Sequence, residues 1–369
     1  MTHRTRLLLA ASVTLATLLA GCRADRPTVD AGEPWSTKHL SSATGPSNLA
    51  TTLNVSTIAA PRTGSIPAAY REAAVDILRQ ALDSPTAQLR ANAIEALELA
   101  PGEAETAAAR GLVDDNRGVR FVAAMTIGRL RLVDMVHLVE PLLDDSSDSV
   151  RASAIFALRQ CGRAPNMAPL ASMILSDDPE VRANAALVLG EMGMPSAVGM
   201  IRESLGRGLR LVSPARVRLV ELQMAEALVL LGEVQEIEVI RAALFSPGEQ
   251  GEVTALACLM CGRLRDGRAV PNLERLAFSE ESRGQPTEVR LAAIQALAMI
   301  VASPVPPAVP SRELSNGMFQ IRAQAALALG EIGDPTLLPV LARHLGDESG
   351  IVQVSAARAI LQIDARRSR

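Results

Sequence analysis

One ten-residue pattern recurs nine times from residue 67 onward, and it constrains the fold more than any other feature of the chain. The pattern is an apolar residue, Arg, two variable positions, Ala-Ala, two further variable positions and Leu-Gly. Its clearest copies span residues 181–190 and 321–330. Successive copies start 30 to 42 residues apart, and most of these spacings are close to 31. A period of this size holds two short helices, so the sequence predicts a stack of helical hairpins.

The pattern itself forms the second helix of each hairpin, and we number that helix from its Arg position. Short acidic links such as 114–116 and 347–349 precede it, and Asp and Ser are residues that cap helix N-termini. Glycine-rich ends at 190–193 and 330–333 are typical of helix C-termini. Met224, Thr254 and Gln353 take the Arg position in three copies. The other six copies carry Arg90, Arg120, Arg151, Arg182, Arg290 and Arg322.

Composition agrees with an all-α protein. Aromatic residues make up only 2% of the 369 residues, whereas 48% are hydrophobic, most of them suited to helices. The formal net charge is −3, which gives no reason to expect nucleic acid as a partner.

At this level the chain resembles HEAT repeats, and specifically the short HEAT-like repeats found in phycobilin lyases. The resemblance implies a right-handed α-solenoid of about nine repeats over residues 67–364, with the second helices on the concave side. Helices that pack 8–10 Å apart would give a rod or arc of about 80–90 Å. An insertion at 206–213 and a proline-rich break at 301–310 interrupt the repeats, and a basic tail, 365–369, follows them.

The recurring Arg lies on the packed side of its helix, together with the Ala-Ala and Leu positions. In HEAT repeats this Arg pairs with an acid in the preceding link, and the candidate pairs here are Asp115 with Arg120 and Asp145 with Arg151. We therefore expect a structural ladder of ion pairs rather than a ligand site. Binding of a ligand by this column of arginines is the alternative.

A stripe at offsets +2, +5 and +9 lies opposite the packed side and should face the concave groove of a solenoid. The stripe is polar in the terminal copies, as at Glu95 and Arg358, and charges border it at Arg129 and Arg263. Its middle is apolar, which is typical of an interaction surface. The predicted partner-binding residues are Val122, Met125, Phe156, Leu187, Val229, Leu256 and Leu259. Phe156 is the expected anchor, at least partly accessible to solvent.

Catalytic and metal-binding patterns are weak. Cys258 and Cys261 form a single C-x-x-C inside a repeat helix, and no His lies nearby to complete a zinc site. His137 and His344 are not followed by Glu, unlike the His-Glu pairs of the related HEAT-like di-iron hydroxylases. We therefore expect no enzyme activity, no metal, no cofactor and no small-molecule substrate.

Residues 1–21 read as a signal peptide: basic residues precede a short apolar run, which ends in Leu19-Ala20-Gly21-Cys22. This ending resembles the bacterial lipobox, which implies cleavage before Cys22 and acylation of that residue. Residues 22–66 would then form the acylated Cys and a flexible tether rich in Ser, Thr, Pro and Gly. Arg23 after the Cys, instead of Asp, favours the outer membrane over the inner one.

These features together predict a lipid-anchored envelope protein that faces the periplasm. We expect it to act as a non-catalytic scaffold or adaptor for a protein or peptide that binds along the concave groove. Two alternatives stay open: a lyase-like or chromophore-attachment factor, and a purely structural spacer of the envelope.

Overall fold

The computed structural model describes residues 68–209, 213–279 and 284–367, and these are entirely helical apart from loops and turns. The predicted signal peptide, Cys22 and the tether lie outside the described residues. No helix within the described part is long and apolar enough to cross a membrane.

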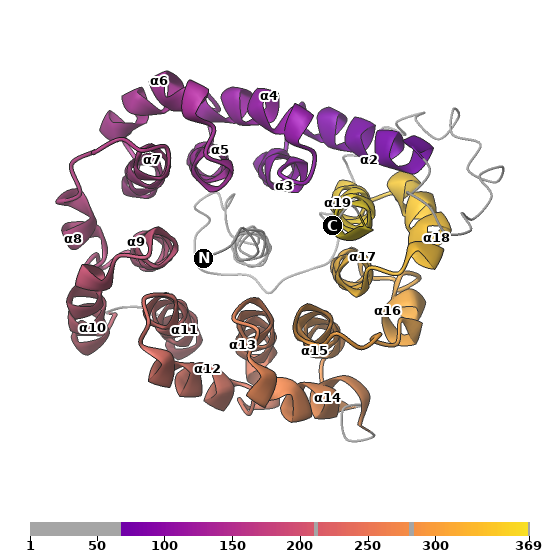
Figure 1. Ribbon diagram of the computed structural model, residues 1–369. Helices are drawn as coiled ribbons and strands as arrows, with labels where there is room; N and C mark the ends of the chain where they lie inside the picture. Colours follow the sequence, from indigo (N-terminus) through magenta and orange to yellow (C-terminus); the bar gives the residue numbers. More distant parts are fainter. Residues whose placement is uncertain (1–67, 210–212, 280–283, 368–369) are drawn as a thin grey trace, which may run out of the picture.

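The described helices form nine hairpins, each with an outer and an inner helix (Figure 1). The outer helices are short, and stretches of 3-10 helix extend several of them. They are α2 (Ala68–Ala81), α4 (Pro101–Leu112), α6 (Val136–Val139), α8 (Pro169–Met173), α10 (Val198–Arg207), α12 (Ile237–Ala243), α14 (Val270–Phe278), α16 (Ala308–Glu313) and α18 (Leu338–Arg343).

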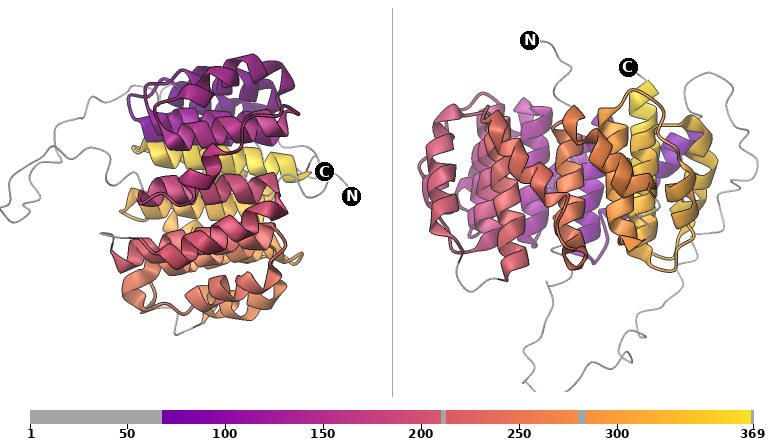
Figure 2. Two further views of the ribbon diagram at one scale, coloured as in Figure 1. Left: turned by 90° about the vertical axis from the view of Figure 1, so that its left-hand side faces the viewer. Right: turned by 90° about the horizontal axis from the view of Figure 1, so that it is seen from below.

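The inner helices carry the recurring pattern, and they stand parallel to one another (Figure 2). They are α3 (Ala87–Leu97), α5 (Arg117–Leu130), α7 (Asp148–Gln160), α9 (Pro179–Met192), α11 (Pro214–Leu230), α13 (Gly251–Arg263), α15 (Thr287–Ile300), α17 (Phe319–Ile332) and α19 (Gly350–Arg367). The all-α solenoid of nine hairpins is thus confirmed. Residues 301–307 contain no helix, as the prolines predict, but the predicted break extends three residues too far. Helix α16 already begins at Ala308 and holds Pro310 in its first turn, where proline is tolerated.

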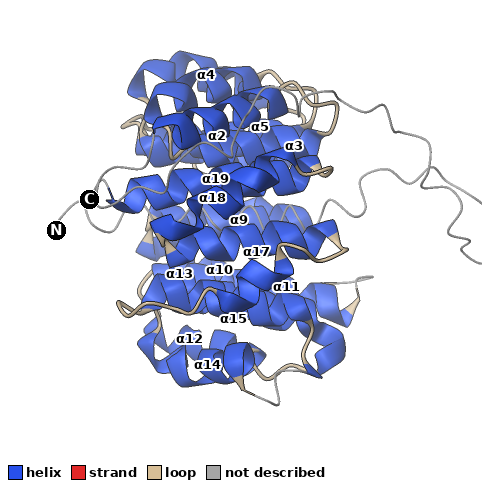
Figure 3. Ribbon diagram, turned by 90° about the vertical axis from the view of Figure 1, so that its right-hand side faces the viewer, coloured by secondary structure: helices blue, strands red, loops and turns tan. Residues whose placement is uncertain are grey.

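The solenoid closes on itself, so the expected rod or arc is wrong. The last hairpin, α18 and α19, lies beside the first, α2 and α3 (Figures 1 and 3). At this seam Arg71 Nε lies 3.2 Å from an oxygen of Asp364. A Cβ on Gly350 would lie only 2.8 Å from Leu89 Cδ1, so the two helices touch. The terminal polar residues meet there as well, because Arg358 Nη1 lies 3.5 Å from Glu95 Oε1 and both side chains are buried.

Small residues on the inner helices account for this curvature. A Cβ on Gly190 would lie 2.9 Å from the Cα of Ala227, and one on Gly330 would lie 2.7 Å from the Cα of Ala359. Inner helices can therefore approach each other closely, which makes each repeat a wedge. Each repeat is rotated in the same direction relative to the one before it, and nine such rotations close the solenoid into a ring.

Two hydrophobic clusters fill the ring, and they meet along α11 and again along α15, where Leu291 belongs to the larger cluster and Ala292 to the smaller one. The larger cluster crosses the seam, so it contains both Ile94 and Ile360. The smaller one covers the repeats of α13 and α15. Helix α11 belongs to both: Leu228 lies in the larger cluster and Leu222 in the smaller one.

Because the ring is closed, a destabilising substitution in the last helix, α19, should also destabilise the first repeat. Ile360 is fully buried, so Ile360→Ala should lower the free energy of unfolding by about 2–5 kcal/mol. Hydrogen exchange measured by mass spectrometry should show lost protection in α3, more than 260 residues away in sequence, as well as in α17. Leu273→Ala, which is equally buried but lies in the smaller cluster, should leave α3 protected. Lost protection confined to α17 in the Ile360 variant would contradict a closed ring.

Candidate binding groove

The ends of the inner helices fix their register. Six of them are followed by a residue with positive φ, which closes a helix C-terminus, and in five of the six this residue lies eleven positions after the predicted origin. These residues are Arg131, Gly162, Gly193, Gly232, Arg265 and Gly333.

Gly232 places the origin of α11 at Glu221 rather than at Met224, three residues earlier than predicted. The contact between Gly190 and Ala227 agrees, because corresponding glycines meet the +6 residue of the next repeat. Offset +5 of α11 is therefore occupied by Glu226. Val229 falls at +8, so its assignment to the concave stripe is wrong.

The arginine ladder exists, but its carboxylates come from the link after each helix, not from the link before it. Arg120 donates from Nε and Nη2 to Asp145, at 2.7 and 3.0 Å, and from Nη1 to the carbonyls of Asp114 and Asp115, at 2.8 and 3.0 Å. Arg90 and Arg322 repeat this arrangement with Asp114 and Asp347. Each guanidinium thus joins the backbone of one link to the carboxylate of the next.

The three other ladder arginines show why the predicted pairs are wrong. Arg151 donates to the backbone carbonyl of Asp145 and pairs with Asp148 on its own helix. Arg120 and Arg322 pair with an Asp 25 residues later in the sequence. The residue 25 positions after Arg151 is Ser176, which has no carboxylate. Arg290 Nε is buried without a hydrogen-bond partner among the described residues.

Arg182 replaces the missing carboxylate with backbone carbonyls. It donates to Ser176 and Gly208 at 2.7 Å each and to Ser204 at 3.3 Å, and its side chain is only 3% exposed. Burial lowers the pKa of this guanidinium. Gly208 belongs to the 206–213 insertion, so the insertion closes this rung of the ladder.

The ladder predicts equal losses of stability from either partner. Arg120→Ala and Asp145→Ala should each lower the free energy of unfolding by about 1–3 kcal/mol, because each leaves a largely buried partner unpaired. Asp115→Ala should change it little, since that side chain is 94% exposed. Urea unfolding of the three variants checks this, and a loss for Asp115→Ala as large as that for Asp145→Ala would contradict the assignment.

The same pair predicts a pH dependence. Burial alone would raise the pKa of Asp145, but hydrogen bonds from Arg120 and from the Ser147 N–H outweigh it and hold this pKa below its usual value. A lowered folded-state pKa contributes stability above the unfolded value, near 3.9, and the contribution is lost as pH falls through the folded value. The difference between wild type and Asp145→Ala should therefore shrink below about pH 4.

Most of the predicted groove residues belong to the core. Val122, Met125, Phe156, Leu256 and Leu259 are at most 4% exposed, so the expected accessibility of Phe156 is wrong. Leu187 and Val229 are half-buried.

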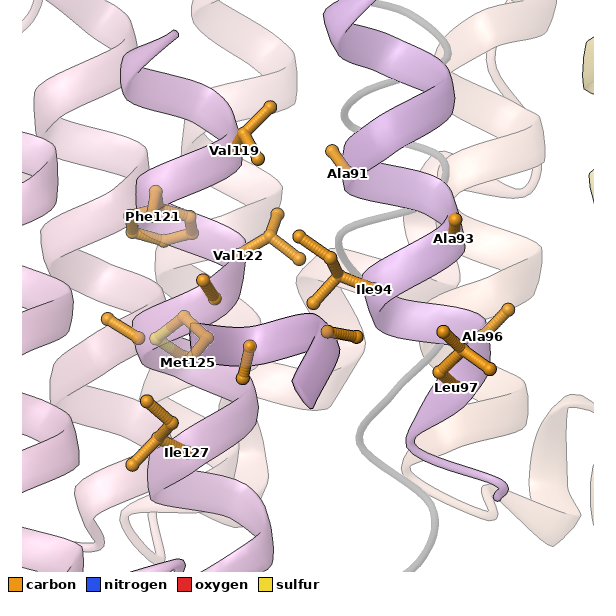
Figure 4. Packing of buried hydrophobic residues seen from close by; sticks show 14 of the residues in the cluster. Ala91, Ala93, Ile94, Ala96, Leu97, Val119, Phe121, Val122, Met125 and Ile127 are labelled. Atoms are coloured by element: carbon orange, nitrogen blue, oxygen red, sulfur yellow. The ribbon is translucent and has the colours of Figure 1, made fainter. Parts of the chain in front are cut away.

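The tight ring explains this burial, because each inner helix is pressed between two others and its +5 position meets a neighbour. A Cβ on Gly128 would overlap the Phe156 ring, which shows that this ring packs between α5 and α7. Figure 4 shows Val122 pointing from α5 toward Ile94 of α3, with Met125 on the next turn.

A groove does exist on the concave side, along α11, and we call it the α11 groove. It encloses about 150 Å³, and residues of α5, α7, α9 and α13 complete its walls. Val122, Leu187 and Leu256 of the predicted set line it, whereas Met125, Phe156, Val229 and Leu259 do not. Helix α11 presents one whole face over about 21 Å: Arg216, Leu219, Val220, Gln223, Glu226, Ala227 and Leu230.

A buried ion pair forms one end of the groove. Arg263 donates from Nε and Nη2 to the two carboxylate oxygens of Glu226, both at 2.8 Å, and the side chains are 4% and 10% exposed. This bidentate pair joins α13 to α11, where the two hydrophobic clusters meet. Arg263 Nη1 is buried and has no hydrogen-bond partner among the described residues.

A second buried pair joins α5 to α9 across the intervening α7. Arg129 donates to the carboxylate of Glu191 at 2.8 and 3.1 Å and lies 3.5 Å from Glu98, which also accepts from Thr126 at 2.7 Å. Burial raises the pKa of Glu191 and of Glu98 despite Arg129. Of the two charges expected to border the concave stripe, Arg129 is thus paired inside the ring, whereas Arg263 is paired and also lines the α11 groove.

The other end of the groove is open and positively charged. Arg117 and Glu180 pair there at 2.9 Å, with both side chains well exposed. Arg216 has no ion pair or side-chain hydrogen bond with any described residue, and the Gln223 amide is likewise without one. Asn184 donates to Ser149 at 3.0 Å.

The sequence reading missed Arg216, Gln223 and Glu226. Gly232 could have identified them from the sequence. Glycine is the residue that most often takes the left-handed conformation just after a helix C-terminus, so its position fixes the register of α11.

The cysteines and histidines form no reactive cluster in the described part of the chain. Cys258 and Cys261 are free and fully buried, and burial raises the pKa of both thiols, that of Cys261 to about 12. The ring nitrogens of His344 lie 2.9 and 3.1 Å from the backbone carbonyls of Val340 and Leu314. No group of three metal-ligating side chains occurs among the described residues.

Comparison with known families agrees with this architecture. A model for HEAT repeats matches residues 75–159 and 135–212, and a model for the PBS lyase HEAT-like repeat matches 321–347. The chain carries HEAT repeats. The matched ranges contain five of the ladder arginines, Arg90, Arg120, Arg151, Arg182 and Arg322. No curated protein matches the chain.

Two solved structures show the extent of the likeness. Human deoxyhypusine hydroxylase in complex with glycerol is 18% identical over 82% of this chain and 99% of its own, with a TM-score of 0.35. Escherichia coli YibA is 19% identical over 81% of this chain and 98% of its own, with a TM-score of 0.28. Likeness at this level carries no argument about activity.

Proposed function

We propose that this HEAT-repeat protein is a lipid-anchored scaffold of the cell envelope that binds a protein or peptide in the α11 groove. The groove is the observation that carries the proposal. It offers apolar walls, such as Leu187 and Leu256, beside side-chain amides and charged groups, and this mixture is typical of polypeptide-binding surfaces.

The rigid frame around the groove supports a binding role. Buried ion pairs, Glu226 with Arg263 and Arg129 with Glu191, fix the inner helices on both sides of it. A surface held in place loses little conformational entropy when a partner binds, which favours affinity. A purely structural spacer would have no need of such a groove.

The anchor in this proposal is Cys22, in the lipobox-like Leu19-Ala20-Gly21-Cys22. Several acyl chains on this residue would hold the protein at the membrane, with the ring facing the periplasm and the outer membrane as the favoured site. Metabolic labelling with an acyl-chain analogue should mark the wild-type protein and not Cys22→Ala. Label on the Cys22 variant would contradict the anchor.

Photocrosslinking tests the groove. Leu230 lines it and is 36% exposed, so a benzoylphenylalanine at this position should crosslink one defined protein in intact envelopes. Val234, four residues later and 68% exposed, does not line the groove and provides the matched control.

The adduct should form from position 230, not from 234, and Leu187→Asp should abolish it without loss of helicity. Equal adducts from both positions, or none from position 230, would overturn the proposal.

A further inference from the structure

The α11 groove has an excess of one positive charge. Arg117 with Glu180 and Arg263 with Glu226 form neutral pairs, whereas Arg216 has no acidic partner among the described residues. Arg216 also lies in the first turn of α11, which contains no acidic residue, so the positive end of the helix dipole adds to its potential. Arg216 is half-buried, and partial burial strengthens its attraction for an anion.

Polar groups without a hydrogen-bond partner in the described part of the chain continue along the same face. The Gln223 amide stands two helical turns beyond Arg216, about 10 Å away along the axis. At the far end, Arg263 Nη1 is a buried donor for which residues 68–209, 213–279 and 284–367 provide no acceptor. Asn184 uses its amide nitrogen on Ser149 and keeps its carbonyl oxygen for another donor. Such groups can pair with the N–H and C=O groups of an extended peptide backbone.

Apolar surface lies between these polar groups. Leu219, Val220 and Leu256 line this middle section, and the space of about 150 Å³ can hold a side chain roughly the size of benzene. Extended backbone spans about 10 Å in three residues, which matches the distance from Arg216 to Gln223.

We propose that the α11 groove binds an extended polypeptide segment in which one Asp or Glu, held by Arg216, lies next to apolar residues. This inference rests on the proposed function and specifies the chemistry of the partner.

A fatty acid would also carry one carboxylate on an apolar chain, but it fits the groove less well. Its acyl chain would cover the Gln223 amide and Arg263 Nη1 without pairing them, and each buried unpaired polar group is unfavourable. A peptide backbone supplies the missing partners.

Selection from a phage library of random nonapeptides tests the proposal on the full chain. Wild-type protein should enrich sequences with Asp or Glu beside Leu, Ile, Val or Phe. Arg216→Gln should lose this preference, and a synthetic peptide from the wild-type selection should bind it about 10-fold more weakly. Arg218→Gln is the matched control, because Arg218 lies on the same helix but pairs with Glu221 and does not line the groove.

Three results would overturn the inference: enrichment that does not depend on Arg216, enrichment of basic peptides, or no enrichment by folded wild-type protein. Titration with decanoate forms a separate arm, and binding of decanoate without selection of peptides would indicate an acyl ligand instead. If Arg216→Gln keeps the Leu230 photocrosslink with full yield, the scaffold proposal stands and the acidic specificity fails.

Discussion

Replacing Phe156 by Ala is expected to lower the free energy of unfolding by about 3–5 kcal/mol. The ring of Phe156 is 2% exposed and fills the space above Gly128 between α5 and α7. Removing it leaves a cavity in a closed ring, where neighbouring repeats cannot move inward freely to fill it. Phe156→Asp should be more damaging still, because it also buries a charge without a partner.

Chemical denaturation followed by circular dichroism measures this effect. Phe245→Ala is the control, since its side chain is 59% exposed and should change stability by less than about 1 kcal/mol. An unchanged unfolding midpoint for Phe156→Ala would mean that this side chain lies on a surface. The residues at offset +5 of the inner helices would then be available to a partner, as the sequence predicted.

Loss of Arg129 is expected to be equally severe. Arg129→Leu should lower the free energy of unfolding by about 3–5 kcal/mol, because it leaves Glu191, whose side chain is 1% exposed, and Glu98 without a cation. The double variant Arg129→Leu with Glu191→Leu should recover part of this loss, since replacing a whole buried pair by apolar residues is close to neutral. A double variant no more stable than Arg129→Leu would show that packing, not charge, is the cause.

The stability deficit of the Arg129 variant should also shrink as pH falls, as for Asp145→Ala, but it should do so at higher pH. Burial raises the folded-state pKa of Glu98 and Glu191, so their contribution is most favourable at low pH and is lost as pH rises through that value. Removing Arg129 raises these pKa values further. The stability deficit of Arg129→Leu should therefore be smaller at pH 5 than at pH 7, as measured by the melting temperature.

The sequence by itself determined the local structure of this protein. Nine copies of one pattern, rich in Ala and Leu and ended by Gly, predicted nine helical hairpins and which helix of each carries the Arg. These features depend on contacts within a repeat or with the next one, so a period near 31 residues reveals them. The break predicted at 301–310 is present over 301–307 for the same reason, because proline acts on its own helix, whereas residues 308–310 form the first turn of α16.

Tertiary structure alone decided the ring and the groove. Small rotations between repeats add up over the whole chain, and no single copy shows that α19 will meet α3. The tight curvature of the ring buried Phe156 and Met125, and Phe156 packs between the adjacent helices α5 and α7 instead of lying on the concave face. The same curvature also paired Arg129 with Glu191, 62 residues away. The site that remains, with Arg216 at its mouth, lies on α11, where an insertion had displaced the repeat and hidden its register.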